Sequence, residues 1–453
     1  MKKPSTFCAF AMAAISAAIM SVNSLYAADR SNTLKIYNWA DYIDFKVLEE
    51  FKAWYTEQTG EPLDIIYQTF DINETMLKEI EIGQEDYDVI CPSEYIIERM
   101  LKNNLLQPIR KDLVPADQYY FDNVAPFVVE KFQQMAPIPA DPAIAPLRVS
   151  DYAVGYMWGT TGWLYNPAFV DADSIRSWGA IVNPKYENHI FVKDAFRDVY
   201  SVLVLYAYKD EIARGEVTRD ELVHHITAER MQRVEDLLIA AKNNIAGWEV
   251  DFGKEEMTKG KMWLNLSWSG DAAWAIEQAA ENGVELGYLV PEEGTNVWFD
   301  GWCIPIYAKN VKAASYFINY MCRPDNAIRN MEEIGYVSVI ASEEIQEWAD
   351  NEDDYPEEID LSYIFGPEAT AVHANQVLYP DKSVIERGAL MHDAADQTED
   401  MLKMWNRVKG DNLSYTMIIF IVVVFVALGI FVILGIVNRR KQRALQSSHH
   451  HKH

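Results

Sequence analysis

The chain has 453 residues, is 49% hydrophobic and carries a formal net charge of −28 at pH 7. The composition is that of a globular protein, and the strong negative charge, which also serves solubility, repels nucleic acid and anionic lipid and favours cationic partners. With the two terminal segments set aside, about 380 residues remain, which predicts two domains.

The first 27 residues have the organisation of a secretory signal peptide. Lys2 and Lys3 supply a positive start, residues 7–20 are apolar or small, and a small-residue cleavage site follows at Ala27 or Ala28. The apolar run is short for a membrane span, which favours cleavage over an uncleaved anchor. We therefore expect residues 1–27 to direct export.

Strands and helices alternate in the next hundred residues. The expected strands are 34–37, 63–69 and 87–91, and the expected helices are 45–58, 73–82 and 94–103. This alternation predicts an α/β fold with a mostly parallel, doubly wound sheet. The first strand is not followed by a GxGxxG motif, so a dinucleotide site is not expected.

A Pro/Ala-rich segment at 137–147 predicts a loop near the first crossover between domains. A second α/β unit follows at 150–297, and residues 302–339 return to a strand-then-helix pattern. The acidic segment 347–360 is interpreted as solvated loop charge rather than as a catalytic acid/base pair.

The chain shows no sign of a metal centre or of catalysis. Cys91, Cys303 and Cys322 have unrelated spacings and predict buried thiols. His224 and His225 lie on a polar helix and are expected at the surface. The sequence has no GxSxG, HExxH or P-loop motif, so neither an enzyme nor a cofactor is expected.

Residues 417–437 carry no charged side chain over 21 positions. At about 1.5 Å per residue they would span one hydrocarbon core, which predicts a single transmembrane helix. Arg439, Arg440 and Lys441 follow directly. The positive-inside rule therefore places residues 438–453 in the cytoplasm and residues 28–412 outside, on the periplasmic face of the inner membrane.

Aromatic and acidic side chains recur where the predicted strands end, which is where open α/β sheets bind their ligands. These residues are Trp39, Asp41, Tyr42, Ser93, Tyr95, Trp268, Asp271, Trp298 and Asp300. Aromatic faces and carboxylates together suit an organic ammonium ion, through cation–π attraction and charge-assisted hydrogen bonds. Asp271 could instead be a helix N-cap, and Trp39 and Trp298 could belong to the core.

Seven motifs in order resemble the periplasmic spermidine/putrescine-binding proteins. They are YNWADYI at 37–43, PSEY at 92–95, WGTTG at 158–162, DAFRD at 194–198, WSGD at 268–271, WFD at 298–300 and IGY at 334–336. The resemblance covers most of residues 34–345. The C-terminal membrane helix departs from it, because the usual family member is soluble.

The resemblance implies a two-lobed periplasmic-binding-protein fold of type II that closes on its ligand. It implies lobe 1 at 33–148 and 301–341, and lobe 2 at 150–297 and 345–410. It adds Asp198 and Tyr336 to the cleft residues named above. Asp41 and Asp271 match carboxylates of putrescine-type members, and Ala195 replaces an Asp of spermidine binders, which favours the diamine.

We expect the chain to be the substrate-binding component of a polyamine ABC importer. The two lobes would close on the protonated polyamine, with Asp41 and Asp300 toward one end and Asp198 and Asp271 toward the other. ABC permease subunits would be its partners, and the membrane helix would hold it near them.

Three alternatives remain open at this point. A membrane-anchored polyamine sensor would need a partner to read the helix, because the tail has only about 16 residues. An enzyme on the same fold lacks a catalytic motif. A ferric-ion binder would need a site rich in oxygen ligands, whereas the carboxylates here are interleaved with tryptophan.

Overall fold

The computed structural model describes residues 30–141, 143–250 and 252–410. The chain divides into one compact unit up to Gln397 and a second unit that starts at Thr398. The expected signal peptide, membrane helix and cytoplasmic tail lie outside the described residues. None of the helices that are described combines the length and the apolar character needed to cross a bilayer.

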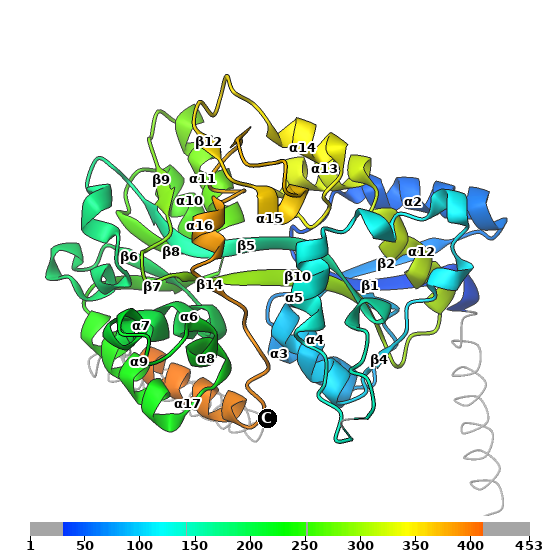
Figure 1. Cartoon of the computed structure of the whole chain (residues 1–453), viewed down its shortest axis with the longest axis horizontal. Coiled ribbons are helices and arrows are strands. Elements are labelled where there is room, and N and C mark those ends of the chain that lie inside the picture. Colours follow the sequence, from blue (N-terminus) through cyan, green and yellow to red (C-terminus); the bar gives the residue numbers. More distant parts are fainter. Residues whose placement is uncertain (1–29, 142, 251, 411–453) are drawn as a thin grey trace, which may run out of the picture. The chain divides into compact units, whose positions relative to one another are not determined.

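One large mixed sheet organises the first unit (Figure 1). Its strands follow one another in space in the order β2 (Asp64–Phe70), β1 (Thr33–Trp39), β3 (Val89–Ile90), β10 (Thr295–Pro305), β5 (Ala153–Tyr165), β8 (Leu264–Trp268), β6 (Ile190–Lys193) and β7 (Ile245–Glu249). Four short strands pair alongside this path: β4 (Leu106–Gln107), β9 (Gly287–Leu289), β11 (Val337–Ser338) and β14 (Gly388–Ala389). A separate pair is formed by β12 (Glu358–Ile359) and β13 (Val372–His373).

The two ends of the sheet are parallel, and two long antiparallel strands join them. β1 pairs in parallel with β2 and β3, and β6 pairs in parallel with β7 and β8. Strands β5 and β10 run through the middle of the sheet, paired antiparallel over most of their length (Figure 1). Both are almost wholly buried, which suits their largely apolar sequences, and Asn296 and Asp300 are buried polar exceptions on β10.

The helices of the first unit flank this sheet (Figure 1), and α17 belongs almost entirely to the second unit. The α-helices are α2 (Phe45–Thr59), α3 (Asn73–Glu81), α4 (Glu94–Lys102), α5 (Pro126–Gln133), α6 (Phe196–Ala207), α7 (Lys209–Ala213), α8 (Arg219–His224), α9 (Ala228–Ala241), α10 (Phe252–Thr258), α11 (Ser269–Glu281), α12 (Val311–Met321), α13 (Pro324–Ile334), α14 (Glu343–Ala349), α15 (Ser362–Phe365), α16 (Lys382–Ile385) and α17 (Gln397–Gly410). Short 3-10 helices cover Arg30–Asn32, Lys111–Leu113, Ala116–Gln118, Phe121–Asn123, Val149–Asp151, Ala172–Ile175, Trp178–Val182 and Pro184–Tyr186.

Helix α2 shows how closely the local signals match the structure. Asp44 caps its start by accepting a hydrogen bond from the Lys46 amide. Phe51 and Tyr55 are buried one turn apart on its inner face. Gly60 ends the helix with a φ of 73°, a left-handed conformation that glycine adopts without strain.

Predictions about single residues also hold. Cys91, Cys303 and Cys322 are buried, free thiols, as expected. The described residues of the 137–147 segment form neither a helix nor a strand.

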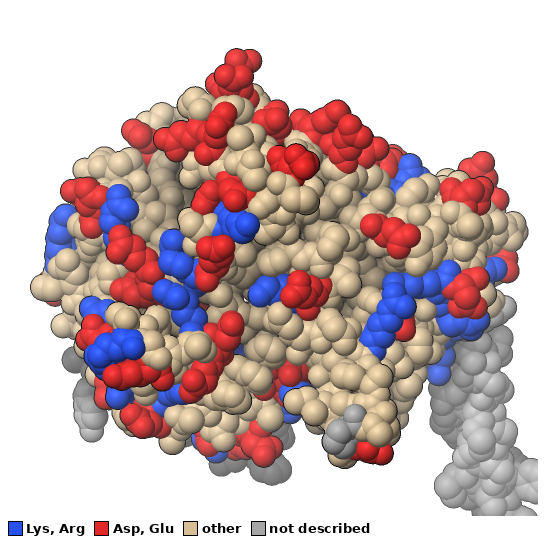
Figure 2. All heavy atoms as spheres, in the orientation of Figure 1, with Lys and Arg blue, Asp and Glu red and all other residues tan. Residues whose placement is uncertain are grey.

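Acidic side chains gather along one edge of the first unit, over α13, α14 and β12 (Figure 2). The exposed acids from residue 332 to residue 358 are Glu332, Glu333, Glu343, Glu344, Glu347, Asp350, Glu352, Asp353, Asp354, Glu357 and Glu358. The 347–360 charges are therefore solvated, as predicted, and the edge attracts cations.

Candidate ligand-binding site

Asp300 lies in the middle of β10 and is 6% exposed. The Tyr42 hydroxyl donates to its Oδ2 at 2.9 Å, and the Ser93 hydroxyl donates to its Oδ1 at 2.7 Å. Tyr42 follows β1 and Ser93 follows β3, and the parallel pairing of these strands brings both residues to the same edge. Ser93 precedes α4 but makes no side-chain capping bond, so its hydroxyl serves Asp300.

Three aromatic rings lie beside this carboxylate. The Tyr42 and Tyr336 ring centroids are 5.5 Å apart, and the Tyr336 and Trp298 centroids are also 5.5 Å apart. All three rings are less than 10% exposed. The Tyr336 hydroxyl donates to Asp271 at 2.9 Å, so the ring cluster connects Asp300 with the start of α11.

A second carboxylate, Asp198, lies in the first turn of α6. It accepts a hydrogen bond from the Trp268 indole at 3.1 Å and another from the Asn296 amide at 3.0 Å. Asn296 lies on β10 two residues before Trp298, so the alternation of side chains along the strand directs both to one face. Strand β10 therefore connects Asp198 with the ring cluster.

These carboxylates and two glutamates form an acidic cluster, defined as Glu74, Glu94, Asp198 and Asp300. Burial raises the pKa of Asp300 to about 7, although hydrogen bonds from Ser93 and Tyr42 act to lower it and the charge of Asp198 raises it further. Burial also raises the pKa of Asp198 and of Glu74, and holds that of Glu94 well above its usual range. Within the described chain, none of the four forms an ion pair with lysine or arginine.

Neighbouring groups orient the cluster without neutralising it. Tyr95 donates from its hydroxyl to Glu74 at 3.2 Å, and Glu94 accepts from the Phe299 amide at 3.1 Å. The Arg197 guanidinium lies 5.1 Å from the centre of the Tyr95 ring, and its charge partly offsets the effect of burial on the pKa of Asp198 and of Glu74. A buried carboxylate cluster of this kind is electrostatically costly unless a cation joins it.

Asp271 differs from the cluster because it already has cationic partners. The Lys193 ammonium lies 2.7 Å from its Oδ2 and the Lys254 ammonium lies 3.0 Å from its Oδ1. Burial acts to raise the pKa of Asp271, but the two lysines hold it below its usual value. Asp271 is 3% exposed and is therefore an ion-paired group rather than a simple N-cap.

Trp39 and Asp41 are the predicted site residues that the structure leaves apart. Trp39 ends β1 with its ring 4.5 Å from Phe70, and Asp41 is exposed with a φ of 50°. Within the described residues, neither makes a hydrogen bond or ring contact with the other nine.

Several residues of this region were not predicted from the sequence. They are Asn73, Glu74, Glu94, Lys193 and Asn296. Glu94 stands inside the PSEY motif. Asn296 lies two residues before Trp298 on β10, so the alternation of side chains along a strand would have identified it. Lys193 ends a strand of only four residues, so the strand-end rule would have selected it had that strand been recognised.

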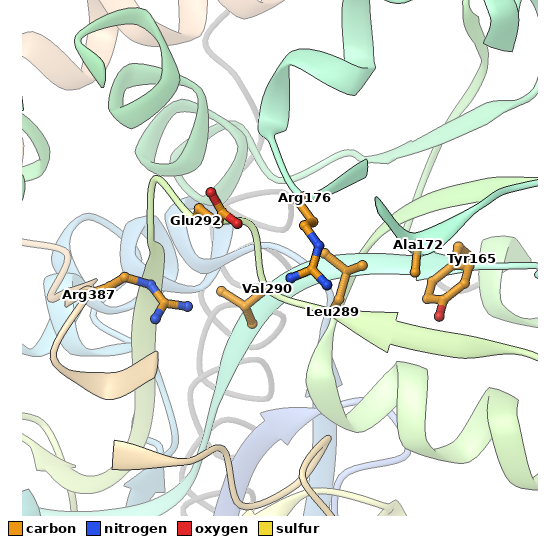
Figure 3. A pocket seen from close by; sticks show the side chains of 7 residues that line it. All are labelled: Tyr165, Ala172, Arg176, Leu289, Val290, Glu292 and Arg387. Carbon is orange, nitrogen blue, oxygen red and sulfur yellow. The ribbon is translucent and has the colours of Figure 1, made fainter. Parts of the chain in front are cut away.

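A cavity of about 550 Å³ lies elsewhere, at the ends of β5 and β9 (Figure 3). Arg176, Arg387 and Glu292 supply its charged side chains, and none of the predicted site residues lines it. Two cations and one anion do not suit an organic ammonium. The acidic cluster is therefore the better candidate site, despite the size of this cavity.

The site is built for binding rather than for bond-breaking. Hydroxyl and indole donors fix the carboxylate oxygens, and aromatic rings flank them. No group of three or more His, Cys, Asp or Glu in the described chain is arranged to hold a metal ion. Carboxylates flanked by aromatic rings offer charge-assisted hydrogen bonds and cation–π contacts, which suit an organic cation.

Curated relatives match nearly the whole chain. The spermidine/putrescine-binding periplasmic protein of Salmonella typhimurium is 27% identical over 398 residues, which cover 88% of this chain and 97% of the relative. The putrescine-binding periplasmic protein PotF of Escherichia coli is 28% identical over 338 residues, covering 72% of this chain and 82% of PotF. These matches confirm the resemblance drawn from the seven motifs.

Solved structures support the two-lobed periplasmic-binding-protein fold. The spermidine/putrescine ABC transporter substrate-binding protein PotD of Streptococcus pneumoniae is similar with a TM-score of 0.60 and 26% identity, covering 84% of this chain and 99% of PotD. A putative spermidine/putrescine ABC transporter protein from Listeria monocytogenes has the same TM-score and 27% identity, covering 85% of this chain and all of the other. Residues 47–356 match the family described as bacterial extracellular solute-binding protein, and the chain belongs to this family of binding proteins.

Proposed function

We propose that this chain is the substrate-binding protein of an ABC importer for polyamines. The single observation that carries the proposal is the acidic cluster, in which buried carboxylates lie beside aromatic rings without a lysine or arginine ion pair in the described chain. A protonated amine supplies the missing positive charge. The relatives named above are polyamine-binding proteins, which supports the same ligand class and favours transport over sensing.

Asp300 and Asp198 are the proposed acceptors for the two ammonium groups. Each carboxylate accepts two hydrogen bonds from the protein, which leaves lone pairs available for the N–H donors of the ligand. The rings of Tyr42, Tyr336 and Trp298 would cover the methylene chain between them. Tyr95 and Ser93 would orient the acids, whereas Trp39 and Asp41 would act only from the rim.

Lobe closure would complete the site. The proposed lobes are residues 33–148 with 301–341 and residues 150–297 with 345–410. In the absence of a cation, repulsion among the carboxylates would favour an open, hydrated state. Ligand binding would offset that repulsion and present a closed surface to the permease subunits.

The termini would place the protein at the membrane. Residues 1–27 would direct export, 417–437 would anchor the chain in the inner membrane, and 438–453 would lie in the cytoplasm. The anchor would raise the effective concentration of the binding domain near its permease.

Calorimetric titration of the purified full chain tests the proposed ligand class. Putrescine or spermidine is expected to bind with one-to-one stoichiometry, whereas the uncharged analogue 1,4-butanediol is expected to release no heat of binding. Failure of both amines to bind, or equal binding of the diol, would reject the proposal.

A further inference from the structure

Lys193 is a lysine with no exposed side-chain surface. It ends β6, where parallel pairing places it beside Glu249 of β7 and next to the end of β8. Its ammonium lies 2.7 Å from Asp271 and 3.1 Å from Glu249, and it also donates to the Val250 carbonyl. The ammonium therefore donates two hydrogen bonds, to Asp271 and to the Val250 carbonyl, and Glu249 adds an ion pair.

The same ammonium lies 4.5 Å from the centre of the Trp268 ring. A carboxylate pair and an indole face are what a polyamine site offers to a ligand ammonium. In this protein, a side chain of the chain itself occupies that environment.

This internal ammonium borders the acidic cluster. Trp268, which Lys193 covers on one face, donates from its indole to Asp198. Asp271, which pairs with Lys193, accepts from the Tyr336 hydroxyl, and the Tyr336 ring contacts Tyr42. Lys193 therefore lies next to the Asp198 end of the proposed ligand.

We propose that Lys193 fills one cation subsite and thereby restricts the ligand to a short diamine. This inference rests on the proposed function and adds the selectivity of the same site. A triamine would need a third acceptor beyond Asp300 and Asp198. Asp271 is the acid in position to serve, but the Lys193 ammonium already lies against its Oδ2 and covers the Trp268 ring.

Relative affinity for putrescine and spermidine is the decisive readout, because a merely structural lysine would not set it. Calorimetry on the purified full chain is expected to give a putrescine affinity at least about tenfold higher than that for spermidine. The double variant Lys193→Ala/Glu249→Gln removes the ammonium together with the charge of its second partner. It is expected to reduce that preference by about tenfold or more, because Asp271 and the Trp268 face become available to the third amine.

Lys254→Ala is the matched control. It also removes a positive charge from Asp271, but Lys254 is 23% exposed and lies over Trp274, so the Trp268 face stays covered. This variant is expected to keep the wild-type preference.

Two results would overturn the inference while the proposed function stands. One is equal affinity of the wild type for the two amines, and the other is an unchanged preference in a folded double variant. If circular dichroism shows that the double variant is unfolded, the ratio of the wild-type affinities for putrescine and spermidine remains the test. Absence of binding of either amine to the wild type would remove the proposed function and the selectivity with it.

Discussion

The Tyr42 hydroxyl donates a 2.9 Å hydrogen bond to the Asp300 carboxylate, although the two residues stand 258 positions apart in the chain. Both side chains are buried, and Ser93 supplies a second donor to the same carboxylate. Two neutral donors hold Asp300 in place but leave its charge uncompensated. The carboxylate is thereby prepared for a cationic ligand. Its burial raises its pKa, whereas the two hydrogen bonds act to lower it.

Replacement of Asp300 by Asn should weaken putrescine binding by tenfold or more. The substitution keeps the shape of the side chain but removes a buried charge pair worth about 2 kcal/mol or more. Calorimetry measures the change in Kd. Asp220→Asn, at an exposed position of α8, is the control and should leave the affinity unchanged. An Asp300→Asn variant with wild-type affinity would remove Asp300 from the site.

Amine binding should strengthen as the pH rises through about 7. Burial raises the pKa of Asp300 to about 7, so the free protein holds a proton there at lower pH, and the ligand ammonium favours the ionised form. Binding near neutral pH should therefore release a proton.

Titrations in buffers of different ionisation enthalpy measure that proton release. The Asp300→Asn variant should lose the proton release that Asp300 contributes. Asp300 should change its protonation state between about pH 6 and pH 8. A wild-type affinity that stays constant over this range would contradict the role of Asp300 in binding the amine.

Gly270→Ala should reduce both stability and ligand affinity. A Cβ at this position would overlap the Tyr336 ring, which packs directly against the Gly270 backbone. The ring would have to move away from Tyr42 and Trp298, at a cost of about 1–3 kcal/mol. Thermal unfolding measures the loss of stability, and calorimetry measures the loss of ligand affinity. Gly215→Ala is unsuitable as a control, because Gly215 has a positive φ.

Gly410→Ala is the better control, because a Cβ there meets no atom of the described residues within 4 Å and its φ is not positive. An unchanged melting temperature and Kd for Gly270→Ala would show that the Tyr336 ring is not fixed by this contact.

Deletion of residues 411–453 should release the protein from the membrane. The deletion removes the apolar segment 417–437 that we propose as the anchor. Fractionation of cells that express the full chain or the truncated chain, followed by immunodetection, measures the distribution. Retention of the truncated chain in the membrane fraction would place the anchor elsewhere.

The alternation of strands and helices is predicted from hydrophobic periodicity, and several residues of the candidate site are predicted from their position at strand ends. Tyr42, Ser93 and Asp300 were selected by that rule, and the parallel pairing of β1 and β3 brings the first two to one edge. The position of Asp198 followed only from the family resemblance, because a residue in the first turn of a helix carries no such signal.

The ionic partner of Asp271 could not be predicted in the same way. Lys193 stands 78 positions before Asp271, and their contact depends on the register between β6 and β8. A sequence does not show which of its lysines becomes buried. Lys193 is buried because β6, β7 and β8 pack together around it, and that packing is a property of the folded sheet. Trp39 and Asp41 were selected by the strand-end rule, yet the backbone turn at Asp41 leaves that carboxylate exposed.

A crystal structure of the chain with putrescine bound tests the central claim most directly. We expect one ammonium nitrogen within about 3 Å of an Asp300 oxygen and the other within about 3 Å of an Asp198 oxygen, with Lys193 still paired with Asp271. Putrescine bound away from Asp300 and Asp198, or bound to Asp271 in place of Lys193, would contradict it.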